Sequence, residues 1–116
     1  NLPEANLNYI KFDVWTIFNY YPHEVRGVQA ALREGRVEGR LYEGKCADLI
    51  GTIANQRNCS YQSLVIKPDS SRPAERWFFA IQRGDTPENS PIVKLTEEWI
   101  EEWKNLPITS LALARA

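Results

Sequence analysis

The chain has no methionine, only one histidine and only two cysteines in 116 residues. A tetrahedral zinc site takes four ligands, so these three side chains cannot complete one without carboxylates. Cys46 and Cys59 lie outside any Cys-x-x-Cys motif. They could form one disulfide, but a chain without an export signal favours two buried thiols. We therefore expect neither a metal ion nor another cofactor.

Long hydrophobic runs and an excess of basic charge are missing too. No apolar stretch approaches the ~20 residues that span a bilayer, and no signal peptide is recognisable, which predicts a cytoplasmic protein without a membrane segment. Lysine and arginine number 14 and aspartate and glutamate 15, for a net charge of -1. Proteins that hold duplex nucleic acid through its phosphates usually carry a basic excess. The one basic run (Arg33, Arg36, Arg40, Lys45) is interrupted by three glutamates, so we expect a self-neutralised surface and no nucleic-acid partner.

What the chain does contain is enough apolar and aromatic side chain for a core. Hydrophobic residues make up 43% of the sequence, with four tryptophans, five tyrosines and four phenylalanines. A chain of this length is usually one domain. Apolar residues recur at helical spacing, and no segment gives a clear strand. The sequence predicts a mainly α, compact single domain of about five helices, with turns rich in proline and glycine.

The first residues carry a different period. Leu2, Leu7, Phe12 and Ile17 recur every five positions, which resembles the end of a pentapeptide-repeat array, a square β-helical coil. The alternatives are a coincidence, or a helix that begins over residues 13–21. The expected organisation is a short irregular or pentapeptide-like lead at 1–12, a helical domain at 13–106 and a C-terminal tail at 107–116.

Serine, proline and glycine mark helix boundaries in the rest of the chain. Proline is favoured in the first turn of a helix, because its missing N–H would have no partner there. Ser70 or Ser71 can cap a helix in which Pro73 takes the first turn. Gly27 costs about 1 kcal/mol inside a helix, so we expect it to admit another element close by. The predicted helices are 22–35, 46–56, one that starts at Pro73, and 91–105.

The clearest helix opens at Ser90 and Pro91 and ends before Pro107. Its apolar side chains recur at helical spacing, and four glutamates fall on the water-facing side. The predicted core stripe is Ile92, Leu95, Trp99, Trp103 and Leu106. The tail that follows is apolar and must either pack on the domain or associate with a neighbour.

Catalytic residues are hard to find. His23 is the only histidine, and a pair with the Cys46 thiol would be the sharpest enzymatic hypothesis, since a thiolate needs a base or a helix N-terminus to lower its pKa. A lone histidine after a helix-start proline is more often a surface residue, and the apolar neighbours of Cys46 are typical of a structural thiol. We therefore expect a protein without a catalytic site.

The central stretch is the most informative part of the sequence. Between positions 69 and 88, acidic and basic side chains alternate around one short helix. One interpretation is a set of ion pairs that fixes the two loops flanking this helix. Its arginines are Arg72, Arg76 and Arg83, and its carboxylates are Asp69, Glu75, Asp85 and Glu88. The expected partners of the arginines are Asp69, Asp85 and Glu88.

The other interpretation is an arginine-lined pocket. Arg72 and Arg76 lie one helical turn apart and could grip an anionic group, with Trp77 stacked beside it. An arginine that is already paired has fewer donors for a ligand, so the two interpretations compete. The candidate ligand-binding residues are Arg72, Arg76, Trp77, Arg83 and Asp85.

Three segments, 43–54, 68–78 and 84–88, together resemble an uncharacterised family of bacterial and phage-borne proteins, over about residues 13–104. In that family the segment tends to follow pentapeptide-like repeats, and the resemblance implies no activity or site. The family's Cys-x-Cys at a helix start has Asp48 in its second place here, which argues against a metal or a disulfide at this helix.

These features predict a non-catalytic protein-interaction module of a bacterial, phage-related or mobile-element protein. Its partner is expected to be another protein or a second copy of the chain, because an apolar surface is then completed on association. The alternative is a small anionic-ligand binder or enzyme that uses a pocket of Arg72, Arg76 and Trp77.

Overall fold

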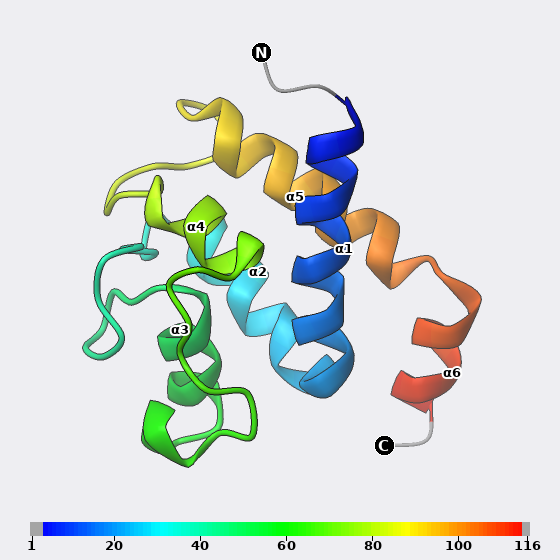
Figure 1. The fold of residues 1–116 in the computed structure, drawn as a ribbon, viewed down its shortest axis with the longest axis horizontal. Coiled ribbons are helices and arrows are strands. Elements are labelled where there is room, and N and C mark those ends of the chain that lie inside the picture. Colours follow the sequence, from blue (N-terminus) through cyan, green and yellow to red (C-terminus); the bar gives the residue numbers. More distant parts are fainter. Residues whose placement is uncertain (1–3, 115–116) are drawn as a thin grey trace.

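The computed structural model describes residues 4–114, which fold into six α-helices (Figure 1). They are α1 (Glu4–Tyr20), α2 (Val25–Arg33), α3 (Leu49–Gln56), α4 (Pro73–Phe79), α5 (Pro91–Lys104) and α6 (Pro107–Ala114). Two short 3-10 helices, η1 (Pro22–Glu24) and η2 (Tyr61–Ser63), lie in the connections. Within residues 4–114 there is no strand, only one isolated bridge between Val37 and Ala47. The predicted mainly α domain is confirmed.

The N-terminal segment is one long helix. α1 runs without a break, so the expected irregular or pentapeptide-like lead is wrong for residues 4–12. The helix contains neither glycine nor proline, and Val14 and Ile17 are fully buried at helical spacing. Phe12, which a five-residue period would place inside a coil, is 54% exposed. Leu2, the first member of that period, lies outside the described residues.

Helix starts follow the predicted chemistry, with one exception. Pro73 and Pro91 each occupy the first turn of their helix, and the Ser90 hydroxyl accepts a first-turn backbone N–H at 3.2 Å. α3 begins later than predicted because Asp48 caps it, accepting a first-turn N–H at 2.8 Å. The exception is α4, whose N-cap position is Arg72, so neither of the two serines before it acts as the cap.

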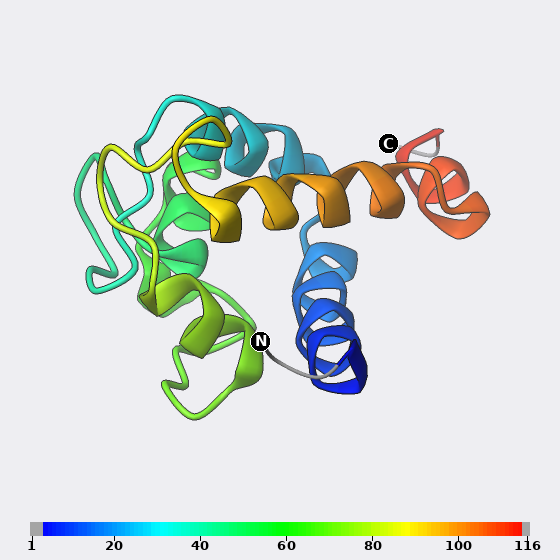
Figure 2. The same cartoon turned by 90° about the horizontal axis from the view of Figure 1, so that it is seen from above.

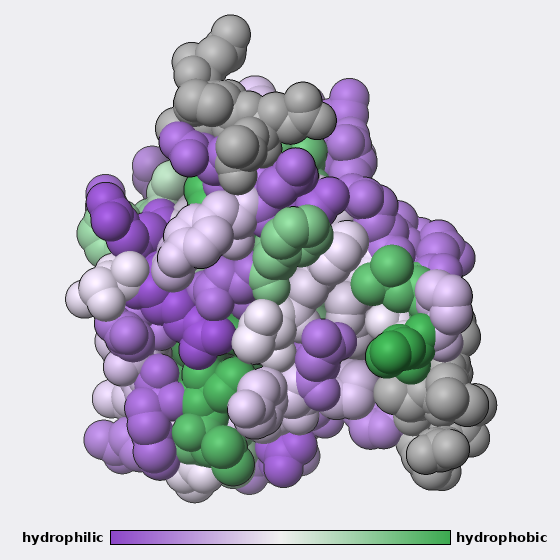
Figure 3. All heavy atoms as spheres, turned by 45° about the vertical axis from the view of Figure 1, so that its right-hand side comes forward, coloured by the Kyte–Doolittle hydropathy of each residue, from purple (hydrophilic) through white to green (hydrophobic). Residues whose placement is uncertain are grey.

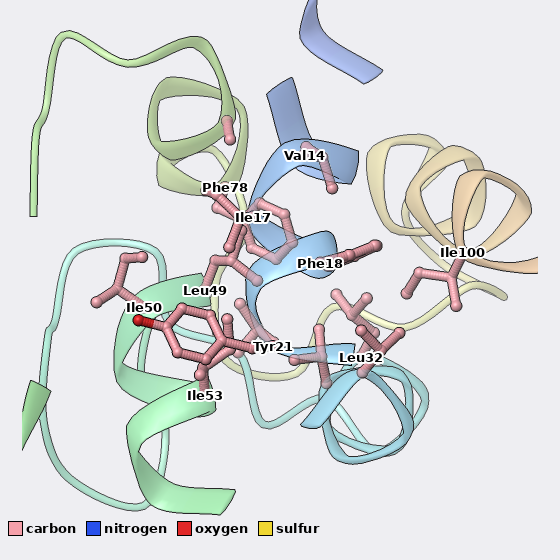
Figure 4. Close-up of a cluster of buried hydrophobic side chains, with 14 of the residues drawn as sticks. Val14, Ile17, Phe18, Tyr21, Leu32, Leu49, Ile50, Ile53, Phe78 and Ile100 are labelled. Atoms are coloured by element: carbon pink, nitrogen blue, oxygen red, sulfur yellow. The ribbon is translucent and has the colours of Figure 1, made fainter. Parts of the chain in front are cut away.

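One hydrophobic core joins the first five helices, whose side chains point toward one another in Figure 4. Burying a large aliphatic or aromatic side chain contributes about 1.5–3 kcal/mol, whereas helices this short are marginal alone. The core, rather than helix propensity, therefore holds the fold. Its members include Val14, Ile17 and Phe18 of α1, Leu32 of α2, Leu49, Ile50 and Ile53 of α3, Phe78 of α4 and Ile100 of α5.

α5 turns a different face to the core than the apolar stripe predicted. Thr96 is fully buried. The core can hold its polar hydroxyl because that group accepts the Trp77 indole N–H and donates to the Ile92 carbonyl, both at 2.7 Å. Trp99 and Trp103 are confirmed as core residues. The buried face of α5 lies closer to Thr96 than the predicted apolar stripe did. The buried residues are Val93, Thr96, Trp99, Ile100 and Trp103, while Ile92, Leu95 and Leu106 are partly buried.

The helices are arranged around α1. α4 packs against it, α5 crosses it, and α2 lies against both α3 and α5 (Figures 1 and 2). α6, the larger part of the predicted tail, turns aside after α5 and packs near η1. None of the described helices combines the length and apolar character that a bilayer span needs. Two concave surfaces lie near opposite ends of α1.

Both cysteines are free thiols, but only one is shielded from solvent. Cys46 is partly buried, whereas Cys59 is exposed, so the expectation of two buried thiols is wrong for Cys59. Cys59 follows Asn58, which has a positive φ of 52° in the turn that ends α3. That turn carries the chain out to the surface and the thiol with it.

Candidate functional site

A groove of about 400 Å³ lies between the first half of α1 and the start of α4. Pro73 starts α4 at the edge of the groove, and the residues one helical turn later face into it. Two of the predicted ligand-binding residues, Arg76 and Trp77, therefore lie together. The full lining is Asn6, Tyr9 and Ile10 from α1, with Ser71, Pro73, Arg76 and Trp77 from α4 and the turn before it.

Arg72, the third member of the predicted pocket, is held by α1 instead. Its Nε donates to both carboxylate oxygens of Asp13 at 3.0 Å. The same carboxylate accepts the backbone N–H of Ala74 at 2.9 Å. Asp13 therefore caps α4 from a neighbouring helix, which explains why Ser70 and Ser71 are not needed as caps. Arg72 is paired, as the ion-pair interpretation predicted, but with a carboxylate outside the central stretch.

Two of the three carboxylates predicted as arginine partners make other contacts. Asp69 accepts the backbone N–H and the hydroxyl of Ser71 at 3.0 and 2.6 Å, and these hydrogen bonds hold the pKa of Asp69 below its ordinary value. Asp85 accepts the backbone N–H of Gln82 at 2.9 Å and closes the turn after α4. Among the side chains that the structure describes, neither of these nor Glu88 lies within 4.0 Å of an arginine nitrogen. That part of the prediction is wrong.

Arg76 is the one candidate arginine that lines the groove. It is exposed, and no carboxylate among the described side chains lies within 4.0 Å of it. Arg83 and Asp85 lie in the turn between α4 and α5, outside the groove lining, where the Arg83 backbone N–H donates to Glu38 at 3.3 Å. The structure therefore brings together only Arg76 and Trp77 of the five candidate residues.

Trp77 is fixed in place beside Arg76. Its indole N–H donates to Thr96, and its ring lies 4.9 Å from the Trp99 ring, centroid to centroid. A tryptophan held on both sides can present its remaining edge to a ligand without losing side-chain freedom on binding. Tyr9, on the opposite wall, is 68% exposed. Sequence spacing alone did not identify Tyr9, because it belongs to a helix that was expected to start later.

Half of the basic run that begins at the end of α2 is neutralised by ion pairs. Arg33 pairs with Glu97 of α5, and Arg36 pairs with Glu34 at 2.7 Å. Arg40 lies over the Phe79 ring at 5.1 Å. The predicted self-neutralised surface is therefore found for two of the four basic side chains.

A second group of polar side chains lies inside the protein, where α3, α4 and the loop before α3 meet. Glu75 is almost fully buried, and it accepts the Tyr42 hydroxyl at 3.0 Å and the backbone N–H of Asp69 at 2.6 Å. Burial, and then the hydrogen bond to Glu75, raises the pKa of Tyr42 to about 12. Burial also raises the pKa of Asp48 to about 7, against the opposing hydrogen bond from the Gly51 N–H.

This buried cluster is structural in character. Every buried side-chain nitrogen and oxygen among the described residues has a hydrogen-bond partner, so no polar group in it is left to receive a ligand. Tyr42 also stacks on Tyr61, with ring centroids 5.2 Å apart. Sequence spacing could not predict this cluster, because its residues come from three separate segments.

The proposed thiol–histidine pair is not assembled. His23 is exposed on η1 and Cys46 is partly buried in the loop before α3, and no hydrogen bond joins them in the structure described. Over residues 4–114, no three histidine, cysteine or acidic side chains are grouped closely enough to hold a metal ion. Comparison of the chain with protein-family models, curated proteins and solved structures finds no match.

Proposed function

We propose that this chain is a non-catalytic interaction module that binds a segment of a partner protein in the groove between α1 and α4. The observation that carries the proposal is the composition of the groove. Arg76 is the only charged side chain among its described lining residues, and it stands beside Tyr9, Pro73 and Trp77. Aromatic residues and arginine are the side chains most enriched at the centres of protein interfaces.

The chemistry of the groove selects a partner segment with a carboxylate next to an apolar side chain. An arginine without an internal ion pair can form two parallel hydrogen bonds with a carboxylate. The apolar faces of Pro73 and Ile10 and the edge of Trp77 give the neighbouring side chain a surface to cover. An extended segment with an aspartate or glutamate flanked by leucine, phenylalanine or proline meets both requirements.

The outer face of α1 supports a protein partner over a small ligand. Tyr9, Phe12 and Tyr20 of α1 are all more than half exposed, whereas Val14 and Ile17 of the same helix are buried. Tyr9 lines the groove, and the other two add exposed apolar surface further along the helix. A small ligand in the groove would leave this surface uncovered, whereas a longer chain segment can cover part of it.

A small anionic ligand at Arg76 and Trp77 is the second candidate. Arg76, which has no carboxylate partner among the described side chains, favours it, but Arg72 is already engaged by Asp13, so the pocket offers one cation rather than the two that were predicted. An activity would in addition need a base at the groove, and the described lining contains no histidine, cysteine or carboxylate. The bacterial or mobile-element origin suggested by the resemblance is part of the proposal.

The test is fluorescence polarisation with a panel of labelled extended peptides. The panel pairs each peptide that carries glutamate beside leucine, phenylalanine or proline with its glutamine counterpart. We expect the acidic members to bind and the Arg76→Glu variant to lose that binding. Arg83→Glu is the matched control, because Arg83 is an exposed arginine outside the groove, and it should bind as the unchanged protein does.

Three results would overturn the proposal. Equal binding of the acidic and glutamine peptides would remove the role of Arg76. Competition by acetate or phosphate alone, at the same concentration as the peptides, would favour the small-anion candidate. Sedimentation velocity that shows a dimer at micromolar concentration, abolished by Tyr9→Asp, would assign the surface to a second copy of the chain.

A further inference from the structure

A second cavity, of about 370 Å³, lies near the other end of α1, where η1 and α2 meet α5 and α6. Figure 3 views this side of the molecule, with hydrophobic surface on α6 at the right. The apolar walls of the cavity are Val25, Trp103 and Leu113, and its edge carries His23, Arg26 and Lys104. The peptide groove shares none of these residues, so the two sites can be altered independently.

The floor of this cavity is rigid and apolar. Trp103 is 1% exposed, its indole N–H donates to Asn19 at 2.9 Å, and its ring packs edge-on against Phe18 at 5.4 Å. With its one donor satisfied, the small part of the indole that reaches the cavity is carbon surface. Val25 is also buried, while Leu113 closes the cavity from α6. Such walls favour an apolar ligand group.

The edge of the cavity carries net positive charge. Lys104 is partly neutralised, because its Nζ lies 3.1 Å from Glu101, which also accepts the Gln29 amide. Arg26 and His23 have no carboxylate within 4.0 Å among the described side chains. Among the described side chains, Arg26 is therefore the cation at this edge that has no ion pair and can offer its guanidinium donors to a ligand.

We propose that this cavity binds a small amphipathic carboxylic acid, with its apolar part against Trp103 and Leu113 and its carboxylate on Arg26. The volume falls within the range of small-molecule sites, roughly 300–1,000 Å³. A guanidinium forms its strongest hydrogen bonds with carboxylate and phosphate oxygens. An apolar floor below Arg26 thus selects a ligand with an anionic head group and an apolar body. This site does not depend on the peptide groove.

The test is titration of the full chain with octanoate, followed by backbone amide NMR shifts. Octanol and octylammonium serve as neutral and cationic analogues of the same length. We expect octanoate to move the signals of η1, the start of α2 and the end of α5, and to bind at least about tenfold more tightly than either analogue. Arg26→Gln should weaken octanoate binding by about tenfold.

Two further variants separate this site from general surface binding. Leu113→Asp places a carboxylate at a partly exposed wall position, so it should weaken octanoate binding while leaving the circular dichroism spectrum unchanged. Arg83→Gln, an exposed arginine outside the cavity, is the control and should bind octanoate normally.

The proposal is overturned if octanol binds as tightly as octanoate, or if Arg26→Gln and Leu113→Asp both leave octanoate binding unchanged. It is also overturned if a peptide with a C-terminal leucine carboxylate shifts these signals while octanoate does not, since the occupant would then be a protein tail. Arg76→Glu alters only the groove between α1 and α4, so this variant should still bind octanoate. A failure of the peptide proposal can then be told apart from a failure of the octanoate proposal.

Discussion

The Asp13 carboxylate stabilises a helix to which it does not belong. From the middle of α1 it accepts two kinds of donor, the Arg72 guanidinium and the backbone N–H of Ala74. Both carboxylate and guanidinium are largely shielded, with side-chain exposures of 18% and 22%. A charge-assisted hydrogen bond in such a place contributes more than the ~0–1 kcal/mol of an exposed ion pair. One residue thus fixes the wall of the groove that carries Arg76.

Replacing Asp13 should separate its contribution as the cap of α4 from its contribution as the ion-pair partner of Arg72. We expect Asp13→Ala to lower the free energy of unfolding by about 1–3 kcal/mol, because it leaves a helix N-terminus uncapped and a guanidinium unpaired. Asp13→Asn keeps an oxygen for the Ala74 N–H and should cost less. Urea unfolding of both variants and of Arg72→Ala measures this. Equal stability of Asp13→Ala and the unchanged protein would show that solvent replaces the carboxylate without cost.

The pair of Arg72 and Asp13 also shows which contacts the sequence alone cannot predict. The prediction that Arg72 is paired was correct in kind, since a charged donor next to a helix start tends to find a carboxylate. Its partner was wrong, because Asp69 is near in sequence but is already used by Ser71. Asp13 lies 59 positions away, and only the packing of α1 against α4 brings it close. Local spacing can suggest that a group is satisfied without identifying what satisfies it.

At the scale of elements, all four tryptophans make contacts between helices. Trp99 is 3% exposed, packs against Trp77 of α4, and its carbonyl accepts the Trp15 indole N–H from α1 at 3.0 Å. α5 therefore contacts two helices at this one position. The sequence predicted α5 and its tryptophans correctly, since a long apolar period with a serine–proline start is a strong signal. It missed Thr96, because burial of a threonine depends on a partner in another helix.

Trp99→Ala should therefore be severely destabilising. We expect it to lower the free energy of unfolding by about 3–5 kcal/mol, which is a large part of the 5–15 kcal/mol typical of a domain. Chemical denaturation followed by circular dichroism measures this loss. Ile108→Ala is the control, because Ile108 is 77% exposed and should change stability by less than about 0.5 kcal/mol. Unchanged thermal stability of Trp99→Ala would contradict the packing described for α5.

The loop between α2 and α3 is held against α4 by a glycine. The Gly39 N–H donates to the Ile81 carbonyl at 2.8 Å, and a β-carbon at this position would overlap the Phe78 carbonyl and lie 2.6 Å from the Phe79 Cα. Both are backbone atoms, so neither can move away as a flexible side chain could. The loop can lie this close to α4 only because position 39 has no side chain.

Gly39→Ala should consequently cost at least about 2 kcal/mol of stability. Gly27→Ala is the matched comparison, because an added β-carbon there meets only the side chain of Gln56. That side chain can swing away, and alanine is favoured over glycine inside a helix by about 1 kcal/mol. Thermal unfolding of both variants should show a large loss for Gly39→Ala and a small change for Gly27→Ala. A similar small change in both would mean that the loop can shift.

At the scale of the whole molecule, the chain folds to the expected size for its length. The radius of gyration is 13.2 Å, close to the ~13 Å expected of a compact domain of this length. Composition alone predicted a single compact core, because 43% hydrophobic residues in 116 positions suffice for one. The two candidate sites could be predicted only in part. Arg76 and Trp77 are neighbours in sequence, but Tyr9, Arg26 and Leu113 join their sites through the arrangement of helices.

The buried acid cluster makes the stability of the whole protein depend on pH. Folded Asp48 keeps its proton up to a pKa of about 7, whereas the unfolded chain releases it near 3.8. The folded state therefore binds more protons between these values, and its stability falls as pH rises from about 4 to 7. The lowered pKa values of Asp69 and Glu101 act in the opposite direction, but only below about pH 4.5, where those exposed carboxylates take up protons.

We expect the melting temperature to be higher at pH 5 than at pH 8, and Asp48→Asn to remove most of this difference. Asparagine retains an oxygen for the Gly51 N–H, so the cap of α3 is kept while the buried charge is removed. The difference between a pKa of about 7 and 3.8 corresponds to at most about 4 kcal/mol. Differential scanning calorimetry at pH 5, 6, 7 and 8 tests this. Replacement of the exposed Asp69 by Asn is the control, and it should keep the original slope of melting temperature against pH.

If Asp48→Asn shows the same slope as the unchanged protein, another group must bind the proton. Tyr42 cannot be that group, because burial raises its pKa to about 12, well above the range in which the slope is measured.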